Sequence, residues 1–296
     1  MIVRDKPTVW DLLTALRGSV VPQILRPVGF LVLFALAMVA VDHRWHILPR
    51  LDGSAFAIFG IGLSLFLGFR NNAAYDRWWE ARRLWGGLLA DLRSLAREAE
   101  VFLPDPPARE KLLRGALVFL HCHRLNLRRR PAGPGDLPAV RALAGTAHPP
   151  CAALDAMNDL VAQALRDGRL DGFGARTLST RLASMALQQA GCERIAGTPL
   201  PFVYSLLIYR TVFMYCLLLP LALNATTGWM TPVFAGVVAY MFLGLAEVSE
   251  DLSHPFSESQ NGIALDALCR AAEISLAPHL GEAPPPPLVP QRHYLS

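Results

Sequence analysis

The segment GIGLSLFLGFRNNAAYDRWWEARRLW, from Gly60 to Trp85, changes its character at Arg70 without a break. Before Arg70 it holds apolar and small residues, and after Arg70 it holds charged side chains and tryptophans. No proline occurs between Ser54 and Leu103 in a chain that has 23 prolines, and Ser54 is a good helix N-cap. The sequence therefore predicts one long helix with an apolar first half and a polar second half.

The length of this helix exceeds what a membrane can cover. About 45 helical residues extend for about 65–70 Å, because each residue adds about 1.5 Å. The hydrocarbon core of a bilayer is only about 30 Å thick. We therefore expect the polar half to project into the cytoplasm, with Arg70 at the membrane surface or at a wet cavity.

The composition favours a membrane protein. Of the 296 residues, 53% are hydrophobic and only 18% are charged. The apolar segments predict four membrane helices, at about 20–42, 54–72, 203–224 and 229–248. Aromatic residues and arginines stand at their edges, as at membrane interfaces. A buried helical bundle of a soluble protein is the alternative.

The rest of the chain is expected to be helical and cytoplasmic, which makes the fold all-α. We expect a single domain over 1–296, with a cytoplasmic part at about 73–200 and 249–280. The tail 281–296 begins with a proline-rich stretch that favours the polyproline II conformation.

Charge predicts the orientation in the membrane. The turn NATTG at 224–228 has no basic residue, whereas the segment after Phe69 is rich in arginine. Short loops rich in Lys and Arg stay in the cytoplasm. Both termini and the long middle segment are therefore expected inside, and the 224–228 turn outside.

Two stripes with a spacing of four residues run along the apolar half of the long helix. One stripe consists of the small residues Gly60, Ser64 and Gly68. The other consists of the bulky residues Ile61, Leu65 and Phe69. Around an axis shared by several copies, the small stripe would seat neighbouring helices and the bulky stripe would form three hydrophobic rings of a narrow pore. On spacing alone, packing of both stripes inside a monomeric bundle is the favoured alternative.

The stretch FLGFRNNAAYDRWWEARRLWG, Phe66–Gly86, resembles the bacterial bestrophins. Further similar blocks follow in the same order along nearly the whole chain, at Gly18–Leu25, Gly191–Val212, Met230–Gly236 and Ala264–Leu276. The resemblance implies a homopentameric ion channel of a bacterial inner membrane, with four membrane helices in each subunit. It implies as partners other copies of the chain, membrane lipid and monovalent ions, with no cofactor and no nucleic acid.

The resemblance also implies where the pore is narrow. Three bulky apolar residues at a spacing of four form the neck in this family, and they correspond here to Ile61, Leu65 and Phe69. A second constriction at the cytoplasmic exit is expected within Phe173–Leu182. The candidates for it are Arg176, Leu178 and Leu182.

Polar residues follow the neck, and their role is open. Asn71, Asn72 and Asp76 either present polar groups to the vestibule below the neck or bond to a neighbouring subunit. Arg210 lies in the third apolar segment, where a charge is costly. The two interpretations are a position on the permeation path and pairing with an acid between helices, and we expect the pairing.

Metal binding is not expected. Eukaryotic family members carry an acidic calcium-binding run after a Pro-Phe pair, but Pro255-Phe256 is followed here by SESQNG with Glu258 as its one acid. Ca²⁺ takes six to eight oxygen ligands, so calcium-independent function is expected. His121 and His123 are two residues apart on a helix and point away from each other. The five cysteines are scattered and suggest neither disulfides nor a metal cage.

The sequence bears on three classes of function. An enzyme would need paired carboxylates, clustered histidines or an activated nucleophile on the membrane helices, and the four apolar segments offer none. A non-conducting oligomeric scaffold is the alternative to a channel. The hydrocarbon neck does not reveal whether anions such as chloride or cations pass, although copies of Arg176 at the exit would favour anions. Glu247, Glu250 and Asp251 are expected to be a solvated helix end or a subunit contact.

Overall fold

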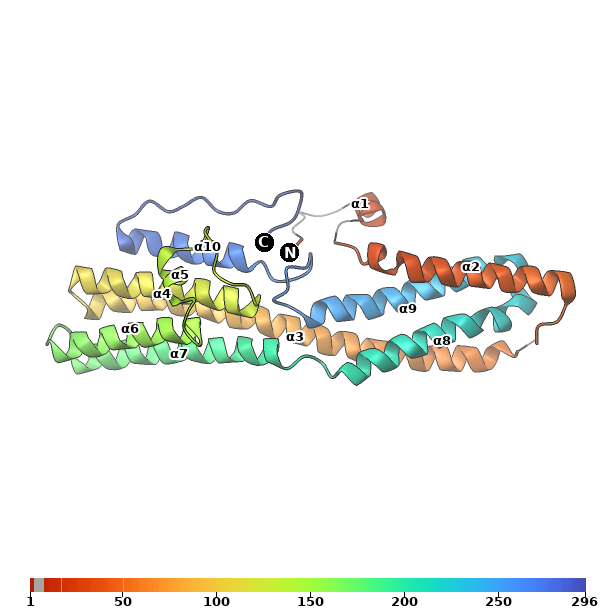
Figure 1. Cartoon of the computed structure of the whole chain (residues 1–296), viewed down its shortest axis with the longest axis horizontal. Helices are drawn as coiled ribbons and strands as arrows, with labels where there is room; N and C mark the ends of the chain where they lie inside the picture. The colour runs from red at the N-terminus through yellow and green to blue at the C-terminus, as the bar shows by residue number, and fades with distance from the viewer. Residues whose placement is uncertain (3–7, 17, 50) are drawn as a thin grey trace. The chain divides into compact units, whose positions relative to one another are not determined.

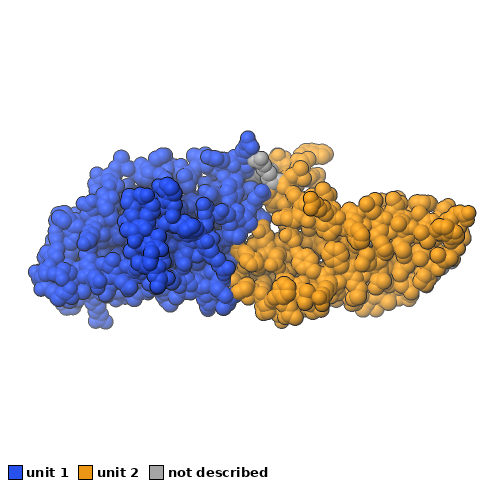
Figure 2. Space-filling view, in the orientation of Figure 1, with its two compact units in different colours: residues 1–4, 79–198, 255–296 blue, residues 5–78, 199–254 orange. Residues whose placement is uncertain are grey.

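The computed structural model describes residues 1–2, 8–16, 18–49 and 51–296. In this part of the chain the regular elements are α-helices and two short 3-10 helices, which confirms the all-α prediction (Figure 1). Where the sequence predicts one domain, the chain divides into two compact units (Figure 2). Unit 1 holds residues 1–4, 79–198 and 255–296, and unit 2 holds residues 5–78 and 199–254.

Unit 2 contains the apolar helices. Its elements are α1 (Val9–Thr14), α2 (Val21–Trp45), the first half of α3 (Gly53–Phe102), α8 (Phe202–Thr227), the 3-10 helix η1 (Gly228–Met230) and α9 (Thr231–Ser253). Helix α3 confirms the expectation of one continuous helix from Ser54 to about Leu103. Its second half belongs to unit 1.

The ends of these helices follow from local backbone chemistry. Helix α2 stops because His46 adopts a left-handed conformation with φ 52°, in which its N–H donates to the Asp42 carbonyl oxygen at 2.8 Å. Gly228 ends α8 with φ 52°, a region that glycine enters without strain. Pro232 lies in the first turn of α9, where its missing N–H is not needed.

Aromatic and aliphatic side chains fill the core of unit 2. The Tyr215 ring on α8 contacts the rings of Phe56 on α3 and Phe242 on α9, with centroids 6.2 and 5.6 Å apart. Buried residues of all four long helices surround it, among them Leu31, Leu63, Leu67, Val212, Leu219 and Leu243. This core fixes which faces of the helices remain outside.

The outer faces of unit 2 are also apolar. Leu33 on α2 is 66% exposed and Met241 on α9 is 58% exposed. Soluble monomers rarely expose large apolar patches. Among the described residues, three stretches are long and apolar enough to cross a membrane: Val21–Trp45, Gly53–Phe102, and Phe202–Ser253, which joins α8, η1 and α9.

Unit 1 packs further helices against the second half of α3. They are α4 (Pro106–Leu127), α5 (Pro138–Leu143), α6 (Pro149–Arg166), α7 (Gly172–Gly197), α10 (Leu265–Leu276) and the 3-10 helix η2 (Ala277–Leu280). Asp171 caps α7, because its carboxylate accepts from the Gly174 N–H at 2.6 Å. The buried Asp91 on α3 accepts from Arg181 on α7 at 2.8 Å.

Two neighbouring histidines of α4 make different contacts within unit 1. His123 is fully buried, and its ring stacks on Trp85 and on Phe119 at centroid distances of 5.6 and 5.9 Å. Burial lowers the pKa of His123 to about 3, so the ring is neutral. The His121 ring instead lies 2.8 Å from a carboxylate oxygen of Glu273 on α10.

Candidate functional site

The bulky stripe on the apolar half of α3 lies on the surface of the subunit. Ile61, Leu65 and Phe69 are 62%, 59% and 71% exposed. On the opposite side of the same helix, Leu63 and Leu67 are buried in the core of unit 2. The bulky stripe therefore does not pack within the subunit. The monomeric-bundle alternative requires such packing, so the structure speaks against it.

The small stripe has two different environments. A Cβ atom on Gly60 would lie 2.7 Å from the Tyr215 hydroxyl oxygen, so Gly60 makes room for Tyr215 within the subunit. A Cβ atom on Gly68 would meet no atom within 4 Å. The close approach of Tyr215 thus explains why residue 60 is a glycine. No contact within the subunit explains the glycine at 68, whose surface is free to meet another molecule.

The polar boundary is built around Arg70, whose side chain is almost fully buried. Its guanidinium donates to a carboxylate oxygen of Glu250, to the Ser205 hydroxyl at 2.8 Å and to the Ala246 carbonyl at 3.3 Å. The Ser205 hydroxyl also donates to Glu250, at 3.1 Å. A buried charge is tolerated only when it is paired and hydrogen-bonded in this way.

Two of the acids near the end of α9 are engaged within the subunit. Glu250 pairs with Arg70, and Glu247 accepts a hydrogen bond from the Tyr209 hydroxyl at 2.7 Å. The sequence suggested a solvated helix end or a subunit contact for these acids, and the structure adds a partner within the subunit for Glu247 and for Glu250. Arg210 is exposed and forms no ion pair in the described part of the chain, contrary to the expected pairing.

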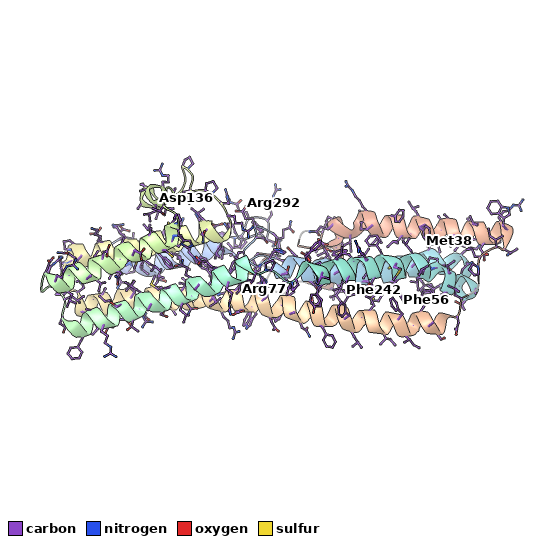
Figure 3. All side chains as sticks on the ribbon, turned by 60° about the horizontal axis from the view of Figure 1, so that its bottom comes forward. Met38, Phe56, Arg77, Asp136, Phe242 and Arg292 are labelled. Atoms are coloured by element: carbon purple, nitrogen blue, oxygen red, sulfur yellow. The ribbon has the colours of Figure 1, made fainter. Side chains whose placement is uncertain are left out.

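The three polar residues after the neck do not behave alike. Asn71 is half-buried, and its side-chain oxygen accepts from the Ser249 hydroxyl at 3.3 Å. Asn72 and Asp76 are exposed. Arg77, labelled in Figure 3, donates to the Ser253 carbonyl at the end of α9 at 2.7 Å.

The candidates for the cytoplasmic exit separate by burial. Leu178 and Leu182 lie in the core of unit 1 with 0% and 5% exposure, whereas Arg176 is exposed. A side chain that lines a pore between subunits must be exposed in the single subunit. The burial of the two leucines speaks against that role, and of the three candidates only Arg176 is retained.

A groove of about 310 Å³ lies beside Phe69 in unit 2. Its lining is mostly apolar, and Arg70 contributes the charged group. Phe66, Ala73, Leu200, Pro201 and Tyr204 complete it. Phe69 therefore borders free space, in keeping with its 71% exposure.

The region after Pro255-Phe256 forms an ordinary ion pair. Glu258 accepts a hydrogen bond from the exposed Arg130 at 2.6 Å. Among the described residues, no group of three or more His, Cys, Asp or Glu side chains is arranged to hold a metal ion.

The helices of unit 2 are long and apolar, and their outer faces are apolar too. The ion pair of Arg70 with Glu250 joins α3 to α9 at the polar boundary. These features are those of an all-α membrane protein. The family model of the Bacterial/Fungal Bestrophin proteins matches residues 1–278. The chain belongs to this bestrophin family.

Curated relatives match over almost their full length. The chain is 45% identical to a voltage-dependent anion channel-forming protein of Mesorhizobium japonicum, with 100% of this chain and 97% of the relative covered. It is 36% identical to the voltage-dependent anion channel-forming protein YneE of Escherichia coli, with 99% of each covered.

Solved structures show the same fold. The chain matches the crystal structure of a bacterial bestrophin homologue from Klebsiella pneumoniae with a TM-score of 0.81 and 30% identity. The match covers 88% of this chain and 100% of the solved one. The curated relatives are named as channel-forming proteins, and none of these names refers to an enzyme.

Proposed function

We propose that the protein is a homopentameric ion channel of a bacterial inner membrane, with a hydrophobic neck formed by Ile61, Leu65 and Phe69. The observation that carries this proposal is the exposure of all three side chains on one face of α3, whose other face is packed in the subunit core. Apolar residues exposed on a membrane helix face lipid, another subunit or a pore, and the correspondence of this stripe to the neck positions of the family favours the pore. The names of the relatives as anion channel-forming proteins support conduction of small monovalent ions.

Four membrane helices per subunit are part of the same proposal. They are α2, the first half of α3, α8 and α9, whose bounds resemble the four apolar segments of the sequence. Both termini and unit 1 lie in the cytoplasm in this proposal, since the arginine-rich part of α3 belongs to the inner side. Function without calcium follows from the single acid after Pro255-Phe256, which is already paired with Arg130.

The vestibules complete the pore. We place Asn72 and Asp76 below the neck and Arg176 near the exit, because all three are exposed on their subunit. Asn71 lies at the edge of the vestibule, where Ser249 holds its side chain.

The test is the current of the purified chain in planar bilayers under a KCl gradient, beside the double variant Leu65→Ala/Phe69→Ala. Trimming the neck widens it and removes its dewetted section, so conductance is expected to increase. Phe30→Ala/Leu33→Ala is the matched control, because these two side chains on α2 are 56% and 66% exposed but do not belong to the stripe.

The outcomes separate channel and scaffold. A larger current in the neck variant than in both the wild type and the control supports a channel. No current in any of the proteins, with the pentamer intact, would leave the non-conducting scaffold. The reversal potential in the wild type shows whether chloride or potassium passes.

A further inference from the structure

Three charged side chains lie on α3 between the neck and the end of unit 2. They are Arg70, Asp76 and Arg77. Arg70 is buried and shares its charge with Glu250. Arg77 donates to the carbonyl of Ser253 at the end of α9, where the helix dipole favours a cation. Asp76 is exposed, and its carboxylate has no hydrogen bond or ion pair within the described part of the chain.

Asp76 lies on a different side of the helix from the two arginines. At about 100° per residue, Asp76 lies about 60° from Ile61, between Leu65 at about 40° and Phe69 at about 80°. Arg70 and Arg77 lie on the opposite side, at about 180° and 160°. The structure agrees with this pattern, since the arginines contact α8 and α9 while Asp76 and the neck residues are exposed.

We propose that Asp76 is a selectivity-determining residue, and this inference rests on the pore proposed above. If the stripe of Ile61, Leu65 and Phe69 faces the pore axis, Asp76 faces it too, about 10 Å further along the helix. One Asp76 from each subunit then forms a ring of carboxylates on the cytoplasmic side of the neck. Rings of Asp or Glu favour cations in channels. Monovalent cations are the class of ion that this ring concentrates, and anions are the class that it repels.

Neither Arg70 nor Arg77 offsets the charge of this ring. Both are directed to the inside of their subunit, and the charge of Arg70 is matched by that of Glu250. A charge that several subunits repeat around one axis raises the local concentration of its counter-ions. At about 0.1 M salt the screening length is about 10 Å, so the field of the ring reaches ions at the inner end of the neck.

The test compares Asp76→Asn and Asp76→Lys with the wild type in planar bilayers under a KCl gradient, using the full chain. We expect the permeability ratio of K⁺ to Cl⁻ to fall about tenfold in Asp76→Asn at about 0.1 M salt, and to fall further in Asp76→Lys. The difference should become smaller at about 1 M salt, because screening is stronger. Asp155→Asn is the matched control, since Asp155 is exposed on α6 and its removal changes the same charge.

A second variant tests the same charge effect in case Asp76→Asn does not assemble. Asn72 is exposed and lies on the same side of the helix, at about 20°. Asn72→Asp adds a carboxylate nearer the neck and should raise the permeability ratio of K⁺ to Cl⁻. Currents with an equal ratio in the wild type, Asp76→Asn, Asp76→Lys and Asn72→Asp would overturn the role of Asp76 while leaving the channel in place. No current in the wild type or in the widened neck variant would instead contradict the channel itself.

Discussion

The guanidinium of Arg70 on α3 and the carboxylate of Glu250 on α9 form an ion pair whose arginine side chain is 4% exposed. The two residues stand 180 positions apart in the chain. They join the helix that carries the proposed neck to α9 at the point where apolar sequence gives way to polar sequence.

Removal of one partner of this pair should destabilise unit 2. Glu250→Ala leaves the buried guanidinium without its counter-charge, and we expect a loss of about 2 kcal/mol in the free energy of unfolding, because the carboxylate itself is partly exposed. Thermal unfolding in detergent measures it. Arg70→Met/Glu250→Met should recover most of the loss, since no charge is then left buried. The control is Glu110→Ala, which breaks the exposed pair with Arg114 and should cost less than about 0.5 kcal/mol. Equal losses in Glu250→Ala and Glu110→Ala would show that the buried pair has no special weight.

The two glycines of the small stripe should respond differently to alanine. Gly60→Ala places a methyl group 2.7 Å from the Tyr215 hydroxyl oxygen, and we expect a loss of about 1 kcal/mol as Tyr215 shifts. Gly68→Ala meets no atom of its own subunit, so subunit stability should not fall. Unfolding temperature and the mass of the detergent-solubilised assembly are measured together. A Gly68→Ala protein with an unchanged unfolding temperature but a smaller assembly would place Gly68 at the contact between subunits. A large drop in unfolding temperature for Gly68→Ala would contradict the open environment.

Acid should weaken the contact between α4 and α10. The hydrogen bond with His121 is the main reason why the pKa of Glu273 lies below its ordinary value of 4.5. Because the folded-state pKa is the lower one, the stabilisation is complete above about pH 4.5 and is lost as the pH falls through the folded-state pKa. Glu273→Gln should therefore lower stability by about 1 kcal/mol at pH 7 and approach the wild type in strong acid. Unfolding midpoints between pH 3 and pH 7 test this, with the half-exposed Glu282→Gln as the control. A constant difference across that range would contradict the assignment.

One cysteine of five should react with a maleimide in the native protein. Cys151 is exposed, whereas Cys122, Cys192, Cys216 and Cys269 are buried. Burial raises the pKa of Cys122 to about 11 and that of Cys269 to about 12, which suppresses the reactive thiolate. Mass spectrometry should find one label on the native chain and five after denaturation. Rapid native labelling of Cys122 would show that unit 1 opens more readily than its packing indicates.

Helix positions could be predicted from the sequence with good accuracy, because proline and hydropathy mark them directly. The lack of proline after Ser54 predicts the long helix, and the structure places it at Gly53–Phe102. The apolar segments at 203–224 and 229–248 correspond to α8 and α9, although α9 continues to Ser253. Its last turn is polar, so hydropathy alone ends it too early.

Contacts between distant helices were not predictable in the same way. Nothing local in the sequence pairs Arg70 with Glu250, since the contact depends on how α3 and α9 pack. The burial of Leu178 and Leu182 could have been predicted from the spacing of apolar residues in the sequence. Apolar residues recur on α7 from Ala175 through Leu178, Leu182 and Met185 at steps of three and four, the pattern of a helix face turned toward a core. That pattern argues against a pore-lining role for Leu178 and Leu182.

The stack of Trp85 on His123 gives unit 1 an internal optical reporter. A protonated imidazole quenches the fluorescence of a neighbouring indole much more strongly than a neutral one does. Because burial holds the pKa of His123 near 3, the ring beside Trp85 stays uncharged at every pH at which a cell lives. In a variant that keeps Trp85 as its one tryptophan out of six, the emission of this fully buried indole is expected to report whether the helices around it are assembled, independently of His123 protonation.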